Sequence, residues 1–594
     1  MKSVQRCRDW LAKTLPTLPD DPTHPAQVAL RTYALALSFS LGPALVPFVA
    51  SVASTRKSPM ARWSVLRRVL KRELGYDGFA ASMTMSVAGG AILRALWCLL
   101  VEDTHGRENN QPNLDDPAHG RLEEVRSWLR SLDLTPTQVS FVCNIIPSTI
   151  GVLLLQKGAK KSSKRSGKGK PSPTLDFTLL LVIRALDSLV QSLILRRTRP
   201  SLLETTQNAA ELEPMLLVRE KLEREETRRV NKTRQRMAEK VDAFLFWACS
   251  SRIMWCWFYE PYRLPQSYVK WITAVSNLDE RIPEVLRLVR TGEWSYLKGS
   301  LNHSDLLHDA AKSFGLPASW GDPTVLPAYG GAIANETWKQ IGVTSRPGVG
   351  GLPCEMVHGR VGKRLGLQSS CHANATLRFF RAFAQAFLIY GPVHLVPVLL
   401  TRPRTLLRPA QLVATAAGAL RSTAFLASFI SLYYYTVCLT RTLVLARLLP
   451  FVSHDFWDGP YGCALAGSLT CGASIWIENG RRRGEMALYV LPRALRTCLP
   501  GWMVRSRGWK GRLVERIAFI VSMSTLLTSA VHRPDSLRGL SRWGLAFIMN
   551  GPNAGFWKRK RRDPSIPLTP STAPTPYEIK DFIKDQEGET IHQG

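Results

Sequence analysis

Long apolar runs separated by short basic loops constrain the fold of this chain of 594 residues more than any other feature. About 20 consecutive apolar residues suffice to cross a bilayer as an α-helix, and several runs approach that length. Tryptophan or tyrosine stands at run ends, as in Trp97, Tyr390 and Trp476, which is typical of an interface between lipid and water. The runs cover residues 32–53, 79–101, 139–155, 176–195, 241–258, 382–400, 411–446, 461–477, 486–499 and 517–531.

These runs predict an all-α fold, a polytopic transmembrane helical bundle. The alternative is a large water-soluble helical protein, which does not account for the Arg, Lys and aromatic residues that flank the runs. Eleven cysteines are scattered, many of them inside apolar runs, so no secreted disulfide framework is indicated. The N-terminus lacks the apolar core of a signal peptide, and we therefore expect internal segments to direct insertion into an organelle membrane.

The net charge of +32 lies mostly in the short loops between the apolar runs. That distribution fits the positive-inside bias of membrane proteins better than nucleic-acid binding, and no nucleic-acid partner is predicted. The loop from Lys157 to Lys170 has seven basic residues and no acid. It is expected either to contact anionic lipid headgroups or to be a solvated flexible loop.

The first apolar run resembles a later one, and four further pairs of segments match in the same order. Residues 30–50 contain Gly42-Pro43 and Pro47, and residues 377–401 contain Gly391-Pro392 and Pro397. Ordered matches of this kind indicate duplication, so we predict two tandem membrane repeats that pack together. The other pairs are 79–97 with 426–444, 140–156 with 464–480, 176–189 with 485–498, and 241–264 with 514–537.

The charge of the loops predicts how the two repeats are oriented. The loops after the first segments, 54–78 and 401–424, are both basic, and other corresponding loops are also alike in charge. This favours a parallel repeat, in which four segments of each copy span the membrane and the fifth lies at the surface or re-enters. If the fifth segment also spans, the repeats are inverted.

The Gly-Pro pairs predict an interrupted first helix in each repeat. Proline removes a backbone donor and clashes with the preceding turn. An unpaired carbonyl is costly in lipid, so a break at Gly42-Pro43-Pro47 and at Gly391-Pro392-Pro397 suggests a shared packed interior. The alternative is a simple kink that follows the curvature of the helix.

The remaining segments complete the predicted domain organisation. A tail at residues 1–27 precedes the first repeat, and a soluble, loop-rich insert separates the two repeats. The C-terminal tail is basic, then rich in Pro and Thr, then acidic, which predicts disorder. The first repeat covers 28–271, with the basic loop 157–170 and a charged helix at 197–240; the insert covers 272–376, the second repeat 377–550 and the tail 551–594.

Two cysteines and two histidines near the end of the insert are candidate metal ligands. Cys354, His358, Cys371 and His372 could supply sulfur and nitrogen to zinc. However, the adjacent pair Cys371-His372 is awkward for one tetrahedron, and the spacing is not that of a standard zinc finger. Plain loop structure is the alternative. No other cofactor and no catalytic residue is predicted.

Arginines within the apolar runs are candidates for an internal site. Arg184 and Arg493 lie deep in runs, and Arg94 and Arg441 lie nearer run ends. Charge inside a membrane is expensive and usually faces protein, water or a headgroup, so these residues suggest an anion or lipid-headgroup site between the repeats. The alternative is that the side chains snorkel to the interface, which we favour for Arg94 and Arg441. The possible counter-charges are Asp176 and Glu485.

A stripe of small residues marks one helix face in the second repeat. Ala464, Ser468 and Gly472 follow one another at steps of four residues. Such a stripe lets membrane helices approach closely. It predicts a packing contact and no chemistry.

Three stretches of the second half carry a resemblance to a known family. They are "PCEMVHGRVGKRLGLQSSCHANATLRFFRAFAQAFLIYGPVHLVPVLL", "CALAGSLTCGASIWIENGRRRGEMALYVLPRALRT" and "AFIVSMSTLLTSAVHRPDSLRGLSRW". They resemble the cysteine-containing region and the later helices of the transmembrane protein 135 family. That family is related to peroxisomal membrane proteins and distantly to channel-forming subunits of mitochondrial inner-membrane translocases. The resemblance implies a multi-span protein of peroxisomal or mitochondrial membranes, linked to lipid metabolism and organelle dynamics.

Together these observations predict a non-enzymatic integral membrane protein of the peroxisome or, as second choice, the mitochondrion. It would organise or move lipid or fatty-acid cargo, or serve as a scaffold, with membrane lipids as its partners. The alternative is a protein- or solute-translocating channel or carrier with a polar path between the repeats. A membrane-embedded enzyme is the third hypothesis.

Overall fold

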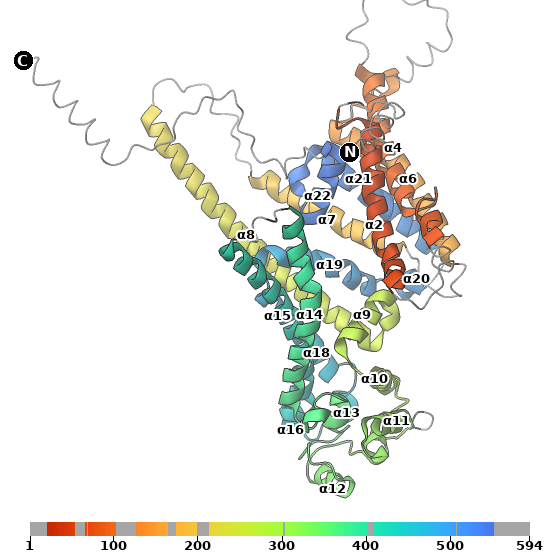
Figure 1. Ribbon diagram of the computed structural model, residues 1–594, viewed down its shortest axis with the longest axis vertical. Coiled ribbons are helices and arrows are strands. Elements are labelled where there is room, and N and C mark those ends of the chain that lie inside the picture. The colour runs from red at the N-terminus through yellow and green to blue at the C-terminus, as the bar shows by residue number, and fades with distance from the viewer. Residues whose placement is uncertain are drawn as a thin grey trace, which may run out of the picture.

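The chain folds almost entirely into helices in the part that the structure describes (Figure 1). A computed structural model places residues 21–53, 69–102, 131–163, 174–198, 213–300, 305–401, 408–505 and 508–551, with a few short pieces between them. Within these ranges the only β-type pairing is an isolated bridge between Ser295 and Gly299. The predicted all-α class is confirmed. Residues 1–18, residues 164–170 of the basic loop, and the tail 552–594 lie outside the described residues.

Among the described residues, five helices are long and apolar enough to cross a membrane, which makes the chain a multi-pass membrane protein. The segment at 463–477 is apolar but shorter. The fourth segments of the two predicted repeats are not among the five candidates. The candidate spans are Phe79–Val101, Pro136–Gly158, Cys371–Val396, Pro409–Leu448 and Trp509–His532.

The first half contributes four helices, of which the first three pack in chain order. They are α2 (Pro25–Ala53), α4 (Phe79–Glu102), α6 (Pro136–Ser163) and α7 (Leu175–Thr198). Helix α4 packs on both α2 and α6. The contact with α6 is close because glycines lie in it: a Cβ added at Gly151 would lie 2.8 Å from the carbonyl oxygen of Ser82. Small residues allow this approach between membrane helices.

The second half repeats this packing order. Its helices are α14 (Cys371–Thr401), α15 (Pro409–Cys438), α18 (Cys463–Cys471) with the 3-10 turn η6 (Gly472–Ile477), and α19 (Gly480–Cys498). Helix α15 packs on α14 and on α18 with η6. The two central helices, α7 and α19, pack against each other and join the halves.

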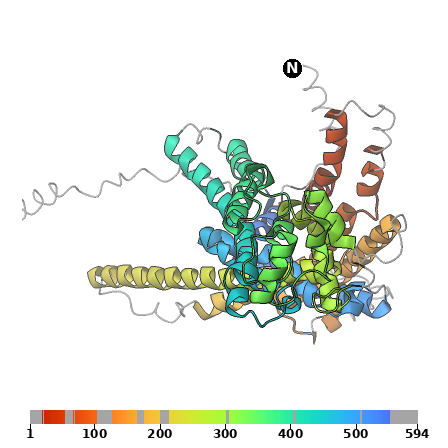
Figure 2. The ribbon, with the colours of Figure 1, turned by 90° about the horizontal axis from the view of Figure 1, so that it is seen from below.

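The fifth helix of each half is exchanged with the other half. Helix α8 (Glu213–Tyr259) belongs to the first half of the sequence but packs on α18, η6 and α19. Helix α21 (Trp509–His532) belongs to the second half but packs on α6 and α7. The N-terminal part of α8 extends sideways from the rest of the helices (Figures 1 and 2).

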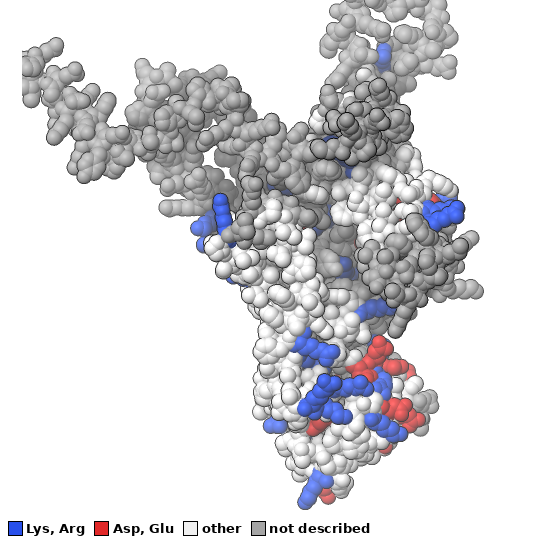
Figure 3. Space-filling model, in the orientation of Figure 1, with Lys and Arg blue, Asp and Glu red and all other residues white. Residues whose placement is uncertain are grey.

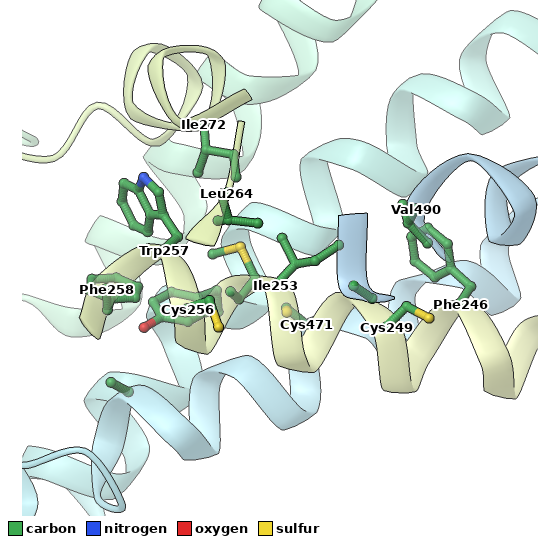
Figure 4. Packing of buried hydrophobic residues seen from close by; sticks show 14 of the residues in the cluster. Phe246, Cys249, Ile253, Cys256, Trp257, Phe258, Leu264, Ile272, Cys471 and Val490 are labelled. Atoms are coloured by element: carbon green, nitrogen blue, oxygen red, sulfur yellow. The ribbon is translucent and has the colours of Figure 1, made fainter. Parts of the chain in front are cut away.

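The largest buried apolar cluster forms around the C-terminal part of α8. Phe246, Ile253 and Trp257 of α8 are buried in it, together with Cys471 of α18 and Val490 of α19 (Figure 4). The indole of Trp247 also donates a hydrogen bond to the carbonyl of Leu469 on α18. These contacts tie α8 to helices that follow it by more than 200 residues in the chain.

The segments that follow α8 and α21 in the chain also correspond to each other. Helix α8 continues into η1 (Pro261–Arg263) and α9 (Gln266–Ser276), and α21 continues into η7 (Pro534–Ser536) and α22 (Gly539–Asn550). Arg378 of α14 donates to the carbonyl of Ser276 in α9 (2.8 Å), and Arg31 of α2 donates to that of Phe547 in α22 (3.4 Å). This correspondence agrees with duplication, which itself stays a prediction.

The predicted interruption of α2 and α14 is wrong. Both helices continue through their Gly-Pro pairs, because a helix can absorb a proline without ending. The described positions also lie outside any packed interior: Gly42 and Pro392 are exposed, and a Cβ added at Gly391 would only touch Phe387 at 3.9 Å. The side chains of Pro43, Pro47 and Pro397 are outside the described part.

The insert has a hydrophobic core of its own. It contains α10 (Arg281–Thr291), α11 (Asp305–Phe314), α12 (Ala332–Ile341), α13 (Cys354–His358), and the 3-10 turns η2 (Ala318–Gly321) and η3 (Lys363–Leu365). Trp294, Leu307 and Met356 are fully buried in that core. The indole of Trp338 donates to the carbonyl of Val349 at 2.7 Å. The insert therefore packs as a unit at the end of α14.

Charge on the visible face separates the insert from the helices above it (Figure 3). Acidic and basic side chains gather over the insert, whereas the surface over the middle of α14 and α15 is uncharged. An uncharged band over two candidate spans is what the hydrocarbon core of a bilayer requires. The insert therefore lies beyond one end of these two candidate spans.

We expect Gly472→Ala to lower the free energy of unfolding by about 1–3 kcal/mol, the usual cost of overpacking. An added Cβ would lie 2.6 Å from Cδ1 and 3.0 Å from Cα of Trp247 on α8. Gly391→Ala is the matched control, because its Cβ has room and alanine favours a helix by about 0.5–1 kcal/mol. Equilibrium unfolding in detergent measures both. Equal effects would contradict the close α8–η6 contact.

Candidate functional site

Three cysteines and one histidine converge where the insert meets α14 and α15. Cys354 and His358 begin and end α13, Cys371 begins α14, and Cys438 ends α15; all four are buried. The Sγ atoms of Cys354 and Cys371 are 3.8 Å apart, and His358 Nε2 lies 3.5 Å from Cys438 Sγ. The ligand atoms of Cys354, His358 and Cys371 all lie within 4.8 Å of one another. We name these four residues the cysteine–histidine cluster.

His372, predicted as a fourth ligand, does not belong to this cluster. Its Nδ1 lies 3.4 Å from the hydroxyl of Tyr435, on an exposed part of α14 and α15. Successive helical residues point about 100° apart, so Cys371 and His372 cannot both face the cluster. Cys438 occupies the fourth position of the cluster instead of His372, although it lies 67 residues after Cys371 in the sequence. The only sequence signal for it is that the run 411–446 has a Cys-Leu-Thr-Arg stretch near its end.

The orientation of His358 is fixed by the loop that follows α13. Its Nδ1 lies 2.6 Å from the carbonyl oxygen of Gln368, so Nδ1 carries the proton and Nε2 faces the cysteines. The side chain of Gln368 donates to the carbonyl of Gly359 at 2.5 Å and so holds the loop. Burial lowers the pKa of His358, which keeps the imidazole neutral and free to bind a metal through Nε2.

A buried guanidinium lies against the same cluster. Arg346 is fully buried, and its Nη1 lies 3.8 Å from Cys354 Sγ and 3.0 Å from Thr442 Oγ1. Its Nη2 donates to the carbonyls of Gly350 and Arg441. None of these hydrogen-bond partners is a carboxylate. Burial of a cation without a paired anion is costly, and it lowers the pKa of Arg346.

Arg441, in contrast, is neutralised by a buried acid. Helix α15 ends in the π-helical turn η5 (Leu439–Leu443), which buries Thr440, Arg441 and Thr442 together. Arg441 binds Asp458 through two hydrogen bonds, Nε to Oδ1 at 2.5 Å and Nη2 to Oδ2 at 2.9 Å. Tyr296 of the insert donates to Oδ2 at 2.5 Å. Snorkelling, which we favoured for Arg441, is therefore wrong, because this partner was invisible in the sequence.

The charge of Arg441 also determines the ionisation of Asp458. Burial alone would raise the pKa of this carboxyl, but the attraction of Arg441 and its hydrogen bonds outweigh burial and lower the pKa below its usual value. Asp458 therefore stays ionised at neutral pH. The pair joins the insert, through Tyr296, to the end of α15.

Ion pairs also cross the contact between the two halves. Arg184 of α7 binds Glu485 of α19, with 3.1 Å between Nη2 and Oε2. Asp176 of α7 binds Arg496 of α19, which was not among the arginines singled out in the sequence. Because the first residues of each helix meet the later residues of the other, α7 and α19 run antiparallel. Each of these two arginines is therefore paired with an acid from the other half of the chain.

The other two predicted arginines have partners of different kinds. Arg493 stacks on Tyr489 and Tyr268, with its Cζ 3.9 Å and 4.9 Å from the ring centroids. Arg94 of α4 donates to the amide oxygen of Asn144 on α6 at 3.3 Å. The structure thus does not bring Arg94, Arg184, Arg441 and Arg493 into one site.

The small-residue stripe faces neighbouring helices. Ala464 and Ser468 are buried on α18, and Gly472 begins η6 against Trp247 of α8. The contact with α8 and α15 agrees with a role in packing.

A basic group near the other end of α14 was not predicted. His394 of α14 is buried, and the guanidinium of Arg482, at the start of α19, donates to its ring. Arg482 also donates to Ser422 Oγ of α15 at 3.2 Å, and Ser422 donates to Glu478 at 2.6 Å. The signal in the sequence was the run Arg481-Arg482-Arg483 directly after an apolar segment.

Comparisons of the chain with protein families, with characterised proteins and with solved structures found no match.

Proposed function

We propose that this protein is an integral membrane protein of the peroxisome or mitochondrion that organises or moves lipids with acidic headgroups, or fatty acids. It would act without catalysing a reaction, as its resemblance to the transmembrane protein 135 family implies. The observation that carries the proposal is the basic group around Arg482 and His394, next to an exposed apolar helix.

The apolar part of this arrangement is the surface of α14. Phe387, Leu388 and Val393 are between 46% and 76% exposed, and they lie within a candidate span. Side chains of this kind at this depth face acyl chains. An acyl chain along α14 would therefore bring its carboxylate or headgroup toward the end where His394 lies.

The basic side chains at the start of α19 are suited to bind an anion. Arg481 and Arg482 are exposed at the start of α19, and Arg483 stacks on Trp476, with Cζ 4.8 Å from the ring centroid. Arginine and tryptophan together are typical of the interface between lipid and water. Basic residues near an anionic lipid surface contribute about 1 kcal/mol each.

Transfer of a fluorescent fatty acid between vesicles that contain the full-length protein and protein-free acceptor vesicles tests this function. We expect Arg482→Gln to slow transfer about fivefold, which corresponds to about 1 kcal/mol for one basic side chain. Arg364→Gln is the matched control, because Arg364 is exposed on η3 of the insert, away from the candidate spans.

Three results would contradict the proposal. They are no transfer by the wild-type protein, equal transfer by Arg482→Gln, and an equal loss in the control. Leakage of a small solute without lipid transfer would instead support the channel or carrier hypothesis.

A further inference from the structure

We propose that Cys354, His358, Cys371 and Cys438 bind one Zn²⁺ ion, which fastens the insert to the membrane helices α14 and α15. The site is independent of the lipid-handling function proposed above, and it lies near the other end of α14 from His394.

Two separations within the cysteine–histidine cluster, one between two sulfur atoms and one between a sulfur and a nitrogen, match those of a tetrahedral site. With Zn–S near 2.3 Å and Zn–N near 2.0–2.1 Å, two tetrahedral sulfur ligands lie about 3.8 Å apart, and a sulfur and a nitrogen lie about 3.5 Å apart. The observed separations are 3.8 Å for Cys354 and Cys371, and 3.5 Å for His358 and Cys438. Three thiolates and one imidazole form one of the usual ligand sets for structural zinc.

Two buried arginines place positive charge beside the cluster. Arg346 and Arg378 are 0% and 3% exposed, and neither has a carboxylate among the hydrogen-bond partners that the structure gives. Zinc binding removes the thiol protons, so a Zn²⁺ with three thiolates carries one negative charge. That charge would lie beside Arg346, which already points at Cys354 Sγ. Neutral thiols would bring no negative charge to Arg346, whose hydrogen-bond partners are a thiol, a hydroxyl and carbonyls.

The hydrogen bonds that orient the ligand residues are also those of a metal site. A metal-bound histidine almost always donates its other ring proton to a carbonyl or carboxylate, and His358 has the carbonyl of Gln368 for this role. Arg378 packs on the same loop, because its Nη2 lies 3.4 Å from the carbonyl oxygen of His358. The ligands are therefore oriented by the fold.

The ligand set indicates a structural role. Four protein ligands complete a tetrahedron and leave no position for a substrate. Two ligands come from α13 of the insert, one from the start of α14 and one from the end of α15. A metal ion there would join three segments that are separated by up to 84 residues (Cys354 to Cys438).

Metal analysis of the full-length protein, purified in detergent without added metal or chelator, tests the proposal. We expect about one zinc per chain, as for other closed four-ligand sites, and less than about a tenth of that in Cys438→Ser. His372→Gln and Cys463→Ser are matched controls that should retain the wild-type zinc content, since neither residue belongs to the cluster. A strong chelator should lower the melting temperature of the wild type, and zinc should restore it.

Cobalt binding gives a second measurement on the wild type, which is needed if Cys438→Ser fails to fold. Co²⁺ exchanged into the site should give thiolate-to-cobalt charge transfer and the visible bands of a tetrahedral site. Three results would overturn the proposal: wild-type protein that takes up neither zinc nor cobalt, zinc content in Cys438→Ser equal to that of the wild type, and a disulfide between Cys354 and Cys371 in place of two metal-bound thiolates.

Discussion

Asp458→Ala is expected to lower the free energy of unfolding by about 3–5 kcal/mol, the usual cost of removing one partner of a buried ion pair. Asp458 accepts hydrogen bonds from Arg441 and from Tyr296, and it is 5% exposed. Without it, the Arg441 guanidinium would remain buried without an anion. Since native stability is about 5–15 kcal/mol in total, the loss would be visible in equilibrium unfolding followed by circular dichroism.

Two further variants separate the ion pair from a general effect of truncation. Replacing both partners, as in Arg441→Met with Asp458→Leu, should cost less than Asp458→Ala, because no unpaired charge remains. Asp535→Ala should change stability by about 0–1 kcal/mol, because its pair with Arg542 is exposed. If the double variant were the least stable of the three, the unpaired charge would not be the cause.

The helices were predictable from the sequence, whereas the contacts between them were only partly so. Apolar length and flanking charge located α4, α6, α15 and α21, because a bilayer imposes both. Asp176 and Glu485 were named as possible counter-charges from two aligned segments, but which arginine each would meet was not predicted; Glu485 pairs with Arg184. Such signals are local or depend on one matched pair of segments.

Residues that meet only through tertiary structure were missed. Cys438 joins the cysteine–histidine cluster because α14 and α15 form an antiparallel pair that brings its position back beside Cys371. Asp458 meets Arg441 because a π-helical turn ends α15. No spacing rule encodes either approach. His372 was chosen instead because sequence proximity was the only criterion available.

Because the fifth helices are exchanged between the halves, a fragment of residues 207–594 should keep a cooperatively folded second half. A fragment of residues 272–594 should not. The shorter fragment lacks α8, which supplies Phe246, Ile253, Trp257 and Phe258 to the largest buried cluster. Truncating one such side chain costs about 2–5 kcal/mol, so the loss of all of them is as large as the total stability of about 5–15 kcal/mol.

The contrast between the two fragments is informative because both lack α2, α4, α6 and α7. Any difference therefore comes from residues 207–271, which the linear order of the sequence assigns to the first half. Limited proteolysis and thermal unfolding in detergent would compare them, and co-expression of residues 1–206 should recover the Asp176–Arg496 contact with the longer fragment. If the shorter fragment folded as well as the longer one, each half would contain all the helices it needs, and α8 would be peripheral. The exchange instead makes the two halves interdependent, so that neither half of the linear sequence specifies a complete packing unit.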